Sequence, residues 1–300
     1  MNKTDNILIT GATGLSGSAI HKELKEQGYT NTFTPTHSEM DLSANRGCIS
    51  DYFKQENIEY VFHCAGIIGG HASHHRVTAS EMITEDIKIN LNTAEASAKN
   101  RVRKLVAIGG QWNYKRNMDR AIKESDYDHS FAGGSSGHDV SKFVLHSLLG
   151  YMKDEGKLDS TVLMIPLLYN EVITDDLHER HPFLHMANNV AHAAKNRSKT
   201  VHLGSTQTNQ RQLIHSVDLA KAAILAMSID TPLLNVANDE VFSMQEIVDK
   251  LKKTFAYTGD ITWENASKNV GPQALDCSLV KSKGWKANYS LDDVAELIRI

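Results

Sequence analysis

The feature that most constrains the fold is a short apolar segment followed by regularly spaced glycines near the N-terminus. Ile7–Ile9 is typical of a buried strand, Gly11, Gly14 and Gly17 follow it, and the amphipathic stretch Ser18–Gln27 predicts a helix. A strand, a glycine turn and a helix in this order suit a dinucleotide, because its pyrophosphate lies against the N-terminal end of the helix. The alternative is a glycine-rich surface loop.

Each of the three glycines has its own expected role in such a turn. Gly11 lets the chain turn tightly, and Gly14 lets backbone N–H groups approach a pyrophosphate that a Cβ would hold away. Gly17 lets the helix pack closely against the strand. The positive end of the helix then faces the phosphates.

Length and composition exclude several classes of protein. A chain of 300 residues, 41% of them apolar, is long enough for one large α/β domain or two lobes. The net charge of −4 does not indicate a nucleic-acid surface. No apolar run reaches the ~20 residues of a membrane helix, and the first residues lack a signal-peptide pattern. Three scattered cysteines without a CxxC motif fit free thiols in the cytoplasm. We therefore expect a cytoplasmic protein with no nucleic-acid or membrane partner.

Strands and helices alternate over the first half of the chain, which favours an α/β fold with a doubly wound parallel sheet. We expect a Rossmann domain over residues 1–168 and a smaller α/β substrate lobe over residues 169–300, with a segment near 212–240 returning to the Rossmann domain. Further strands are predicted at Asn31–Thr36, Glu59–Gly66, Lys104–Gly110, Ser160–Leu168, Gln212–His215 and Leu233–Ala237. Further helices are predicted at Arg46–Gln55, Met82–Asn100, His138–Gly150, Met186–Lys195 and Met244–Phe255.

Three helix starts carry capping signals. Ser216 or Asp218 is expected to cap the helix that follows the strand Gln212–His215. Ser243 and Glu246 form a capping-box pattern before the helix Met244–Phe255. Ser290 and Asp293 are expected to open a final helix.

The end of the second predicted strand bears on the choice between NAD and NADP. A carboxylate there usually binds the ribose 2′-OH of NAD, but the chain holds no acid at residues 34–38 and reaches Glu39 first. This favours NADP, with His37 and Ser38 available to its 2′-phosphate. NAD stays possible because no arginine stands there.

Several motifs together resemble the extended short-chain dehydrogenase/reductase superfamily, in its NAD-dependent epimerase/dehydratase family, and within it the GDP-L-fucose synthases. The resemblance covers nearly the whole chain. The motifs are TGATGLSGSAI, EMDL, AGIIGG, INLNTAEAS, RQLIHSVDLA, LNVAND and LDCSLVKSKGW. Because these relatives are NADPH-dependent epimerase-reductases of GDP-4-keto-6-deoxymannose, the resemblance implies oxidoreductase and isomerase chemistry on a GDP-sugar.

The resemblance, with the turn motif, also implies the residues of the binding sites. Arg211 would pair with the sugar nucleotide's diphosphate, since a planar guanidinium binds phosphate oxygens in pairs, although a surface salt bridge is the alternative. Asp276 would lie near the sugar or the nucleobase, or else cap a helix. The candidate cofactor site comprises Gly11, Thr13, Gly14, Leu15, Gly17, His37, Ser38, Asp41, Leu42, Ala65, Gly66, Ile68, Lys142 and Leu167. The candidate substrate site comprises Gln111, Trp112, Arg211 and Asp276.

The chain departs from the superfamily where the chemistry occurs. The superfamily uses a Ser or Thr, a Tyr and a Lys, of which the Tyr exchanges a proton with the substrate oxygen as hydride moves. Here His138 stands at the tyrosine position, while Lys142 is kept. Gly110 replaces the serine, and Trp112 replaces the cysteine expected to act in epimerisation.

Three interpretations of this altered site stay open. His138 can do the work of the tyrosine, since a histidine of ordinary pKa exchanges protons near neutral pH. Alternatively the chain only epimerises, with His178 or His181 as the nearest candidate base. In the third interpretation it binds cofactor and nucleotide sugar without turnover. Neighbouring residues that could supply a missing hydroxyl or amide are Gln111, Ser135 and Ser136.

The sequence thus predicts an NADP(H)-dependent GDP-sugar reductase or epimerase-reductase. By analogy with its relatives it is expected to form a homodimer through the helices Met82–Asn100 and His138–Lys153. No metal is expected, because no cysteine or carboxylate accompanies the clustered histidines at ligand spacing.

Overall fold

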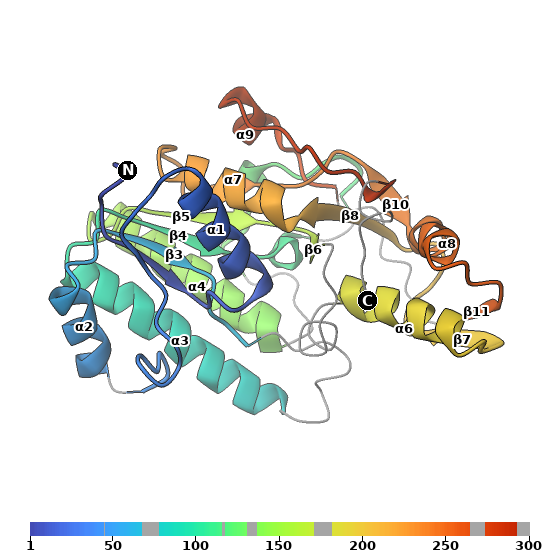
Figure 1. Ribbon diagram of the computed structural model, residues 1–300. Helices are drawn as coiled ribbons and strands as arrows, with labels where there is room; N and C mark the ends of the chain where they lie inside the picture. Colours follow the sequence, from blue (N-terminus) through green and yellow to red (C-terminus); the bar gives the residue numbers. More distant parts are fainter. Residues whose placement is uncertain are drawn as a thin grey trace.

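The large sheet is parallel throughout and lies between two layers of helices. The computed structural model describes residues 1–44, 46–67, 78–115, 118–130, 137–170, 182–264 and 274–292. The sheet has six strands in the order β2-β1-β3-β4-β5-β9 (Figure 1). These strands are β1 (Ile7–Thr10), β2 (Thr32–Phe33), β3 (Tyr60–His63), β4 (Lys104–Ile108), β5 (Ser160–Met164) and β9 (Leu233–Asn235). The predicted doubly wound α/β fold is confirmed.

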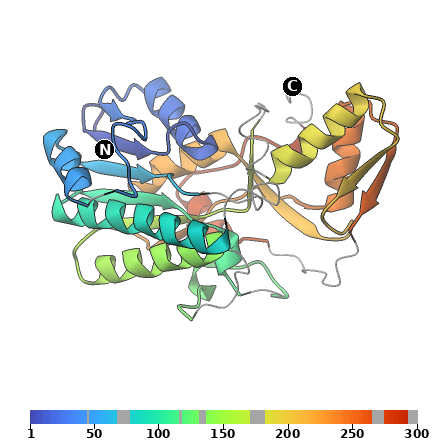
Figure 2. The same ribbon diagram turned by 90° about the horizontal axis from the view of Figure 1, so that it is seen from below.

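Helices cover both faces of this sheet. One face carries α1 (Leu15–Glu26) against α7 (Ser216–Ala226), and the other carries α2 (Arg46–Gln55), α3 (Ala79–Lys99) and α4 (Gly137–Asp154), as Figures 1 and 2 show. The central strands are therefore buried on both sides, which explains why they occur in the sequence as continuous apolar runs.

A smaller lobe is built from two further sheets. One has the order β10-β8-β6, and the other pairs β11 with β7. The strands are β6 (Leu167–Tyr169), β7 (Thr200–Leu203), β8 (Gln210–His215), β10 (Val241–Ser243) and β11 (Asp260–Trp263). The helices are α6 (Pro182–Lys195) and α8 (Met244–Thr254), which lie together beside this lobe's strands in Figure 2, and the short α9 (Ser278–Ser282) follows.

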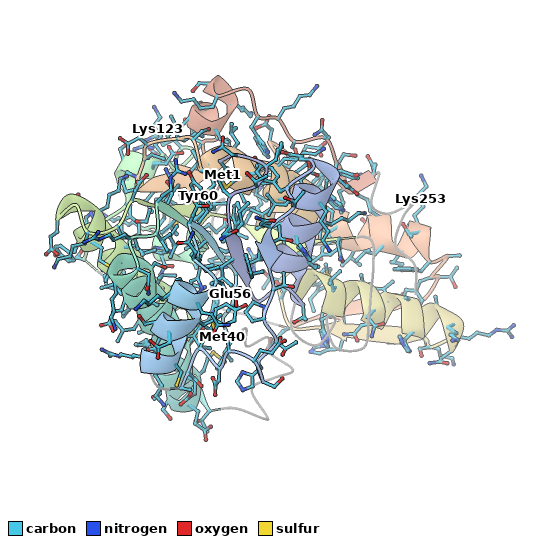
Figure 3. The ribbon with its side chains drawn as sticks, turned by 60° about the vertical axis from the view of Figure 1, so that its left-hand side comes forward. Met1, Met40, Glu56, Tyr60, Lys123 and Lys253 are labelled. Carbon is cyan, nitrogen blue, oxygen red and sulfur yellow. The ribbon has the colours of Figure 1, made fainter. Side chains whose placement is uncertain are left out.

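Helix α8 shows how local sequence determines an element of this lobe. The predicted capping box is confirmed: Oγ of Ser243 accepts from the backbone N–H of Glu246 at 3.1 Å, and the Glu246 carboxylate accepts from the backbone N–H of Ser243 at 2.7 Å. The apolar face, which includes Ile247 and Leu251, is buried. Lys253 projects away from the protein (Figure 3).

One predicted strand, Ser160–Leu168, is wrong. β5 ends at Met164 in the large sheet, and β6 begins at Leu167 in a different sheet. Pro166 separates them, and because proline has no N–H group it cannot continue a ladder of hydrogen bonds. The second strand is also shorter than the predicted Asn31–Thr36, since only Thr32–Phe33 pairs with β1.

The predicted cap of α7 is wrong as well. The N-cap is His215, whose Nδ1 accepts from the backbone N–H of Val217 at 3.3 Å. Asp218 instead binds the C-terminal segment: its Oδ2 accepts from the backbone N–H groups of Asn288 and Tyr289 at 2.9 and 3.0 Å. A residue in the first turn of a helix thus ties a distant segment onto α7.

The domain boundary near residue 168 stays a prediction. β9 pairs with β5 in the large sheet, and α7 packs against α1, so residues 216–235 contact the N-terminal half of the chain. β6 and β8 pair with each other in the smaller lobe. Asp293, expected to open the final helix with Ser290, lies outside the described residues.

Candidate functional site

The glycine turn joins β1 to α1 at the edge of the sheet where the strands end. Gly14 is the N-cap of α1, and its backbone N–H donates to the carbonyl of Gly11 at 3.0 Å. No side chain caps this helix end. The first N–H groups of an uncapped helix are an anion-binding site, so the turn has the properties that a pyrophosphate needs.

Two of the glycines are required by the protein's own packing. Gly11 has φ +65°, and a Cβ there would lie 2.7 Å from the backbone nitrogen of Ala65. A Cβ on Gly17 would lie 2.3 Å from the carbonyl oxygen of Gly11. At Gly14 the nearest atom would be 3.3 Å away, so packing alone does not require a glycine there. That position is the one expected to face the pyrophosphate.

A buried hydrogen-bond chain fixes the next loop beside this turn. Oγ1 of Thr10 accepts from the backbone N–H groups of Cys64 and Ala65 at 3.2 and 3.1 Å, and it lies 2.9 Å from Nδ1 of His63. Because the hydroxyl already accepts twice, it donates to Nδ1. Nε2–H of His63 then donates to Oδ1 of Asn90 at 2.9 Å.

Sequence reasoning missed Thr10 and His63 in this role. The available signal was a polar residue at the end of each of two adjacent buried strands. Burial, with Lys142 nearby, lowers the pKa of His63 to about 4, so its ring is neutral. This buried series of hydrogen bonds from Thr10 through His63 therefore holds Ala65 and Gly66 next to the glycine turn, as the predicted cofactor site requires.

In the loop after β2, the acidic side chains accept hydrogen bonds from residues of the same loop. The Glu39 carboxylate accepts from the backbone N–H and the hydroxyl of Thr36 at 2.7 and 2.8 Å. Oδ1 of Asp41 accepts from the hydroxyl and from the backbone N–H of Ser43, both at 2.8 Å, and these bonds lower the pKa of Asp41. The His37 side chain is 84% exposed, and its Nε2 lies 3.7 Å from the carboxylate of Asp41. The His37 and Ser38 side chains, which are predicted to be available to a 2′-phosphate, therefore lie on an exposed loop.

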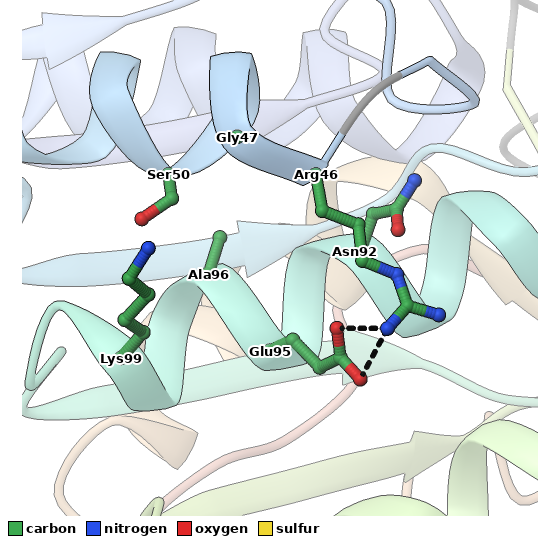
Figure 4. A pocket seen from close by; sticks show the side chains of 7 residues that line it. All are labelled: Arg46, Gly47, Ser50, Asn92, Glu95, Ala96 and Lys99. Atoms are coloured by element: carbon green, nitrogen blue, oxygen red, sulfur yellow. Dashed lines mark hydrogen bonds and ion pairs between the residues drawn. The ribbon is translucent and has the colours of Figure 1, made fainter.

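The adjoining loop is anchored by α3. Nδ2 of Asn92 donates to the carbonyls of Leu42 and Ala44 at 2.8 and 3.2 Å, which places Leu42 against the core. A cavity of about 240 Å³ opens beside this anchor between α2 and α3. Its lining residues are Arg46, Gly47, Ser50, Asn92, Glu95, Ala96 and Lys99, and Figure 4 shows the guanidinium of Arg46 paired with Glu95.

Helix α4 carries the two residues that the sequence analysis predicted to be catalytic, His138 and Lys142. Lys142 is 5% exposed, and His138 lies one turn earlier on the same helix. Nδ1 of His138 lies 3.3 Å from the carbonyl oxygen of Ile67. A Cβ on Gly66 would lie 3.5 Å from Nζ of Lys142, so the loop after β3 passes directly over this lysine. The structure thus brings His138, Lys142 and Gly66 together.

Burial and then the charge of Lys142 lower the pKa of His138, while Asp86 acts in the opposite direction. Asp86, from α3, is fully buried. One carboxylate oxygen accepts from the backbone N–H of Ile67 at 2.8 Å, and the other accepts from the hydroxyl of Ser141 and lies 3.9 Å from Nδ1 of His138. The sequence analysis did not include Asp86, because an acid on a long helix is usually solvated.

The segment after β4 contacts the smaller lobe. The guanidinium carbon of Arg211, on β8, lies 5.3 Å from the centre of the Trp112 ring. Two predicted substrate residues from different lobes are therefore in cation–π contact. The backbone N–H of Gln111 donates to the carbonyl of Ile165 at 2.9 Å, and its side chain is buried.

Two buried polar atoms near this site lack a hydrogen-bond partner. They are Nδ2 of Asn90 and Oε1 of Gln111, and they are among several such atoms in the part of the chain that the structure describes. A buried polar atom without a partner is costly, so such atoms point to a missing ligand or water. With the uncapped start of α1, they fit a nucleotide cofactor and a polar substrate.

The remaining predicted residues are spread more widely. Oδ1 of Asp276 accepts from the backbone N–H of Ser278 at 2.8 Å. Asp276 is not the N-cap of α9, because that position belongs to Cys277, so the predicted capping alternative is wrong. Leu167 is half-buried on β6, and Thr13 is exposed in the glycine turn. The predicted residues Ile68, His178, His181, Ser135 and Ser136 lie outside the described residues.

Within the described ranges, no group of three or more His, Cys, Asp or Glu residues is placed to hold a metal ion. Likewise, none of the described helices combines the length and apolar character needed to span a membrane.

Comparison with known sequences identifies the family. A model of the NAD dependent epimerase/dehydratase family matches residues 7–237. GDP-L-fucose synthase 1 of Arabidopsis thaliana is 27% identical, over 97% of this chain and 91% of its own. GDP-L-colitose synthase of Yersinia pseudotuberculosis is 24% identical, over 95% of this chain and 94% of its own.

Solved structures show the same fold. A GDP-6-OMe-4-keto-L-xylo-heptose reductase from C. jejuni has a TM-score of 0.88 at 22% identity, covering 99% of this chain and 97% of its own. The GDP-mannoheptose C4 reductase MlghC from Campylobacter jejuni, solved with NADP bound, has a TM-score of 0.84 at 22% identity, covering 99% of this chain and 98% of its own. The chain therefore belongs to the NAD dependent epimerase/dehydratase family, an enzyme family built on the Rossmann fold.

Proposed function

We propose that this chain is an NADP(H)-dependent reductase, or epimerase-reductase, of a GDP-linked 4-keto-6-deoxyhexose. The observation that carries the proposal is the meeting of His138, Lys142 and Gly66 beside the uncapped glycine turn. GDP-sugar reductases and synthases among the relatives support the choice of substrate class.

The residues for the cofactor are divided along its length. The N–H groups after Gly14 would hold the pyrophosphate, and His37 with Ser38 would meet the 2′-phosphate of NADP. Lys142 would hold the nicotinamide ribose, where its buried position limits competition from water. When bound, NADPH supplies the hydride for reduction of a carbonyl carbon.

His138 is the proposed acid. Its Nδ1 faces the carbonyl of Ile67, so Nε2, on the opposite side of the ring, is left for the substrate oxygen. As the hydride bonds to the carbonyl carbon, the proton on Nε2 passes to the oxygen, and a ketone becomes an alcohol. In the neutral ring the single proton stays on Nδ1, which faces the carbonyl acceptor of Ile67, so Nε2 carries a proton only in the imidazolium form. The value of kcat/KM for reduction should therefore fall as pH rises through the pKa of His138.

Arg211 is the proposed partner of the substrate's diphosphate. Its contact with the Trp112 ring restricts the position of the guanidinium. If His178 and His181 supply a base, the same site would also epimerise. We further propose that residues 169–300 form the substrate lobe, apart from a segment near 212–240 that returns to the Rossmann domain. We also propose that the enzyme is a cytoplasmic homodimer joined through α3 and α4, where Tyr151 is 66% exposed.

A second candidate function is a protein that binds both ligands without turnover. The observation in its favour is Gly110, which stands at the position of the superfamily's catalytic serine and offers no hydroxyl. A Cβ there would meet no atom within 4 Å, so a serine would fit without strain. Restoring this serine together with a tyrosine at position 138 therefore tests for a decayed site: a gain in turnover supports this alternative.

The deciding experiment mixes the purified protein with NADPH and GDP-4-keto-6-deoxymannose and follows the absorbance of NADPH. We expect oxidation of NADPH by the wild type. The variant His138→Gln should lose about 10²–10⁴-fold in kcat/KM, the range for a general acid. His202→Gln, on the exposed edge of β7, is the matched control and should keep full activity. No oxidation by the wild type, or full activity of His138→Gln, contradicts the proposal.

A further inference from the structure

The carboxylate of Asp86 is fully buried beside the two residues of the proposed site. It lies on α3, is 0% exposed, and faces α4. A buried carboxylate is retained only where hydrogen bonds and opposite charge compensate the loss of water. Its hydrogen bonds come from the Ile67 backbone N–H and the Ser141 hydroxyl.

The side chain of Lys142 ends close to this carboxylate. A Cβ placed on Gly66 would lie 3.0 Å from Oδ1 of Asp86 and 3.5 Å from Nζ of Lys142. Both groups therefore border the same point in space, directly under the loop after β3. The other carboxylate oxygen lies 3.9 Å from Nδ1 of His138. Asp86 thus borders both residues of the proposed site.

We propose that Asp86 is a positioning residue for proton transfer, which holds His138 in place and stabilises its imidazolium form. This inference rests on the proposed function. Asp86 acts through three contacts. It accepts from the backbone N–H of Ile67, the residue whose carbonyl oxygen faces Nδ1 of His138. It also binds the hydroxyl of Ser141, in the turn of α4 that follows His138, and it places a negative charge next to the imidazole.

Several charged and titratable groups face His138. On α4 these are Asp139, Lys142 and His146, and on α3 the group is Asp86. Lys142 disfavours the imidazolium, whereas the two carboxylates favour it. On β3 and the loop after it, His63 and Cys64 lie near Lys142, and burial keeps both of them neutral. His146 is also neutral, because burial lowers its pKa to about 3.

The role follows from the balance of the reduction. Hydride from NADPH bonds to the carbonyl carbon, and the proton on Nε2 of His138 bonds to the oxygen. This yields NADP⁺, an alcohol and a neutral imidazole, which then takes a proton from water. The imidazole must therefore be recharged in every turnover beside a buried ammonium group. The carboxylate of Asp86 favours the imidazolium form and so assists this recharging.

The test measures the charge of His138 directly. In protein labelled at histidine, the His138 ring signal is identified by its absence from His138→Gln, and its titration is followed by NMR. Asp86→Asn keeps the shape of the side chain and removes its charge, and the titration midpoint of His138 should move to lower pH. Glu85→Gln, one residue earlier and paired with Lys88 on the surface, is the matched control and should not move it.

A second variant covers the case in which Asp86→Asn does not fold. Ser141→Ala removes the hydroxyl that binds the carboxylate oxygen nearest to His138, so more of the charge acts on the imidazole. The His138 midpoint should then move to higher pH. An unchanged midpoint in both folded variants, or in Ser141→Ala alone if Asp86→Asn fails to fold, overturns the inference.

Kinetics separates this role from simple support of the fold. For Asp86→Asn, kcat/KM should fall at least about tenfold above neutral pH, as expected for a shift of one pH unit, and should approach the wild-type value in acid. An equal loss at every pH would mean that Asp86 only supports the fold, and would overturn the inference. If the wild type does not turn over GDP-4-keto-6-deoxymannose, the proposed function fails, while the NMR titration still decides whether Asp86 acts on His138.

Discussion

Replacing Gly14 by alanine is expected to weaken NADPH binding while leaving the free energy of unfolding almost unchanged. Gly14 has φ −82° and ψ 172°, a conformation that alanine adopts readily. Its Cβ would approach the Gly11 carbonyl oxygen to 3.3 Å, which a small adjustment relieves. The added Cβ would therefore obstruct the bound pyrophosphate and not the protein's own packing.

The magnitude follows from the contacts that a bound pyrophosphate would lose. Two hydrogen bonds from backbone N–H groups to a charged oxygen are worth about 1.5 kcal/mol each, so their loss raises the Kd of NADPH about 100-fold. The change in unfolding free energy should stay within about 1 kcal/mol, because alanine's entropic advantage and its weaker N-cap preference have opposite signs.

Gly17→Ala is the matched variant, because its clash lies inside the protein. Its Cβ would lie 2.3 Å from the Gly11 carbonyl oxygen, and since both partners belong to the backbone no rotamer relieves the overlap. Overpacking of this kind costs about 1–3 kcal/mol, and each kcal/mol lowers Tm by about 2–4 °C. Gly17→Ala should therefore melt earlier with or without cofactor.

The assay is a thermal melt at rising NADPH concentration, together with a direct binding titration. The wild type should gain stability with ligand, and Gly14→Ala should gain much less at the same concentration. Wild-type affinity of Gly14→Ala would refute the placement of the pyrophosphate against this turn. A wild-type Tm for Gly17→Ala would refute the packing argument.

Two further predictions concern stability. Burial lowers the pKa of His63 to about 4 and that of His146 to about 3, so as pH falls below the ordinary value of about 6.5 the unfolded chain binds protons first. Stability is then fully present above that pH and is lost on acidification, by about 3 kcal/mol for His63 alone by pH 4. Urea unfolding at several pH values measures this loss of unfolding free energy, which should be smaller for His146→Phe than for the wild type. If the unfolding free energy of both proteins fell equally steeply with pH, the lowered pKa of His146 would be contradicted. Asp218→Ala should cost about 3 kcal/mol in the same assay, because the backbone N–H groups of residues 288 and 289 lose their acceptor, whereas Asp239→Ala, at a surface pair, should cost less than about 1 kcal/mol.

Elements whose causes are local were predictable with useful accuracy. The helix Arg46–Gln55 has the predicted bounds, and α8 begins at its predicted capping box. The prediction of one continuous strand at Ser160–Leu168 was wrong, because the two halves of this segment pair in two different sheets. Apolarity identifies a buried strand, but it does not identify the neighbour with which that strand pairs.

The candidate site divides in the same way. His138 and Lys142 were proposed from the resemblance to the superfamily's motif, and their proximity was predictable because one helical turn separates them. Their partner Asp86 was missed, because an acid on a helix is normally solvated, and it becomes important only where α3 packs against α4. The contact between Trp112 and Arg211 likewise joins segments that only the packing of the smaller lobe brings together.

By itself the sequence determined the strand–turn–helix unit and the family to which the chain belongs. These depend on the sterics of a missing Cβ and on hydrogen bonds within a few residues, which neighbours along the chain control. Tertiary structure decided which charges are buried and which side chains meet. Because Asp86 is removed from water, its charge acts strongly on neighbouring groups. Its burial depends on the packing of elements that lie far apart in the sequence.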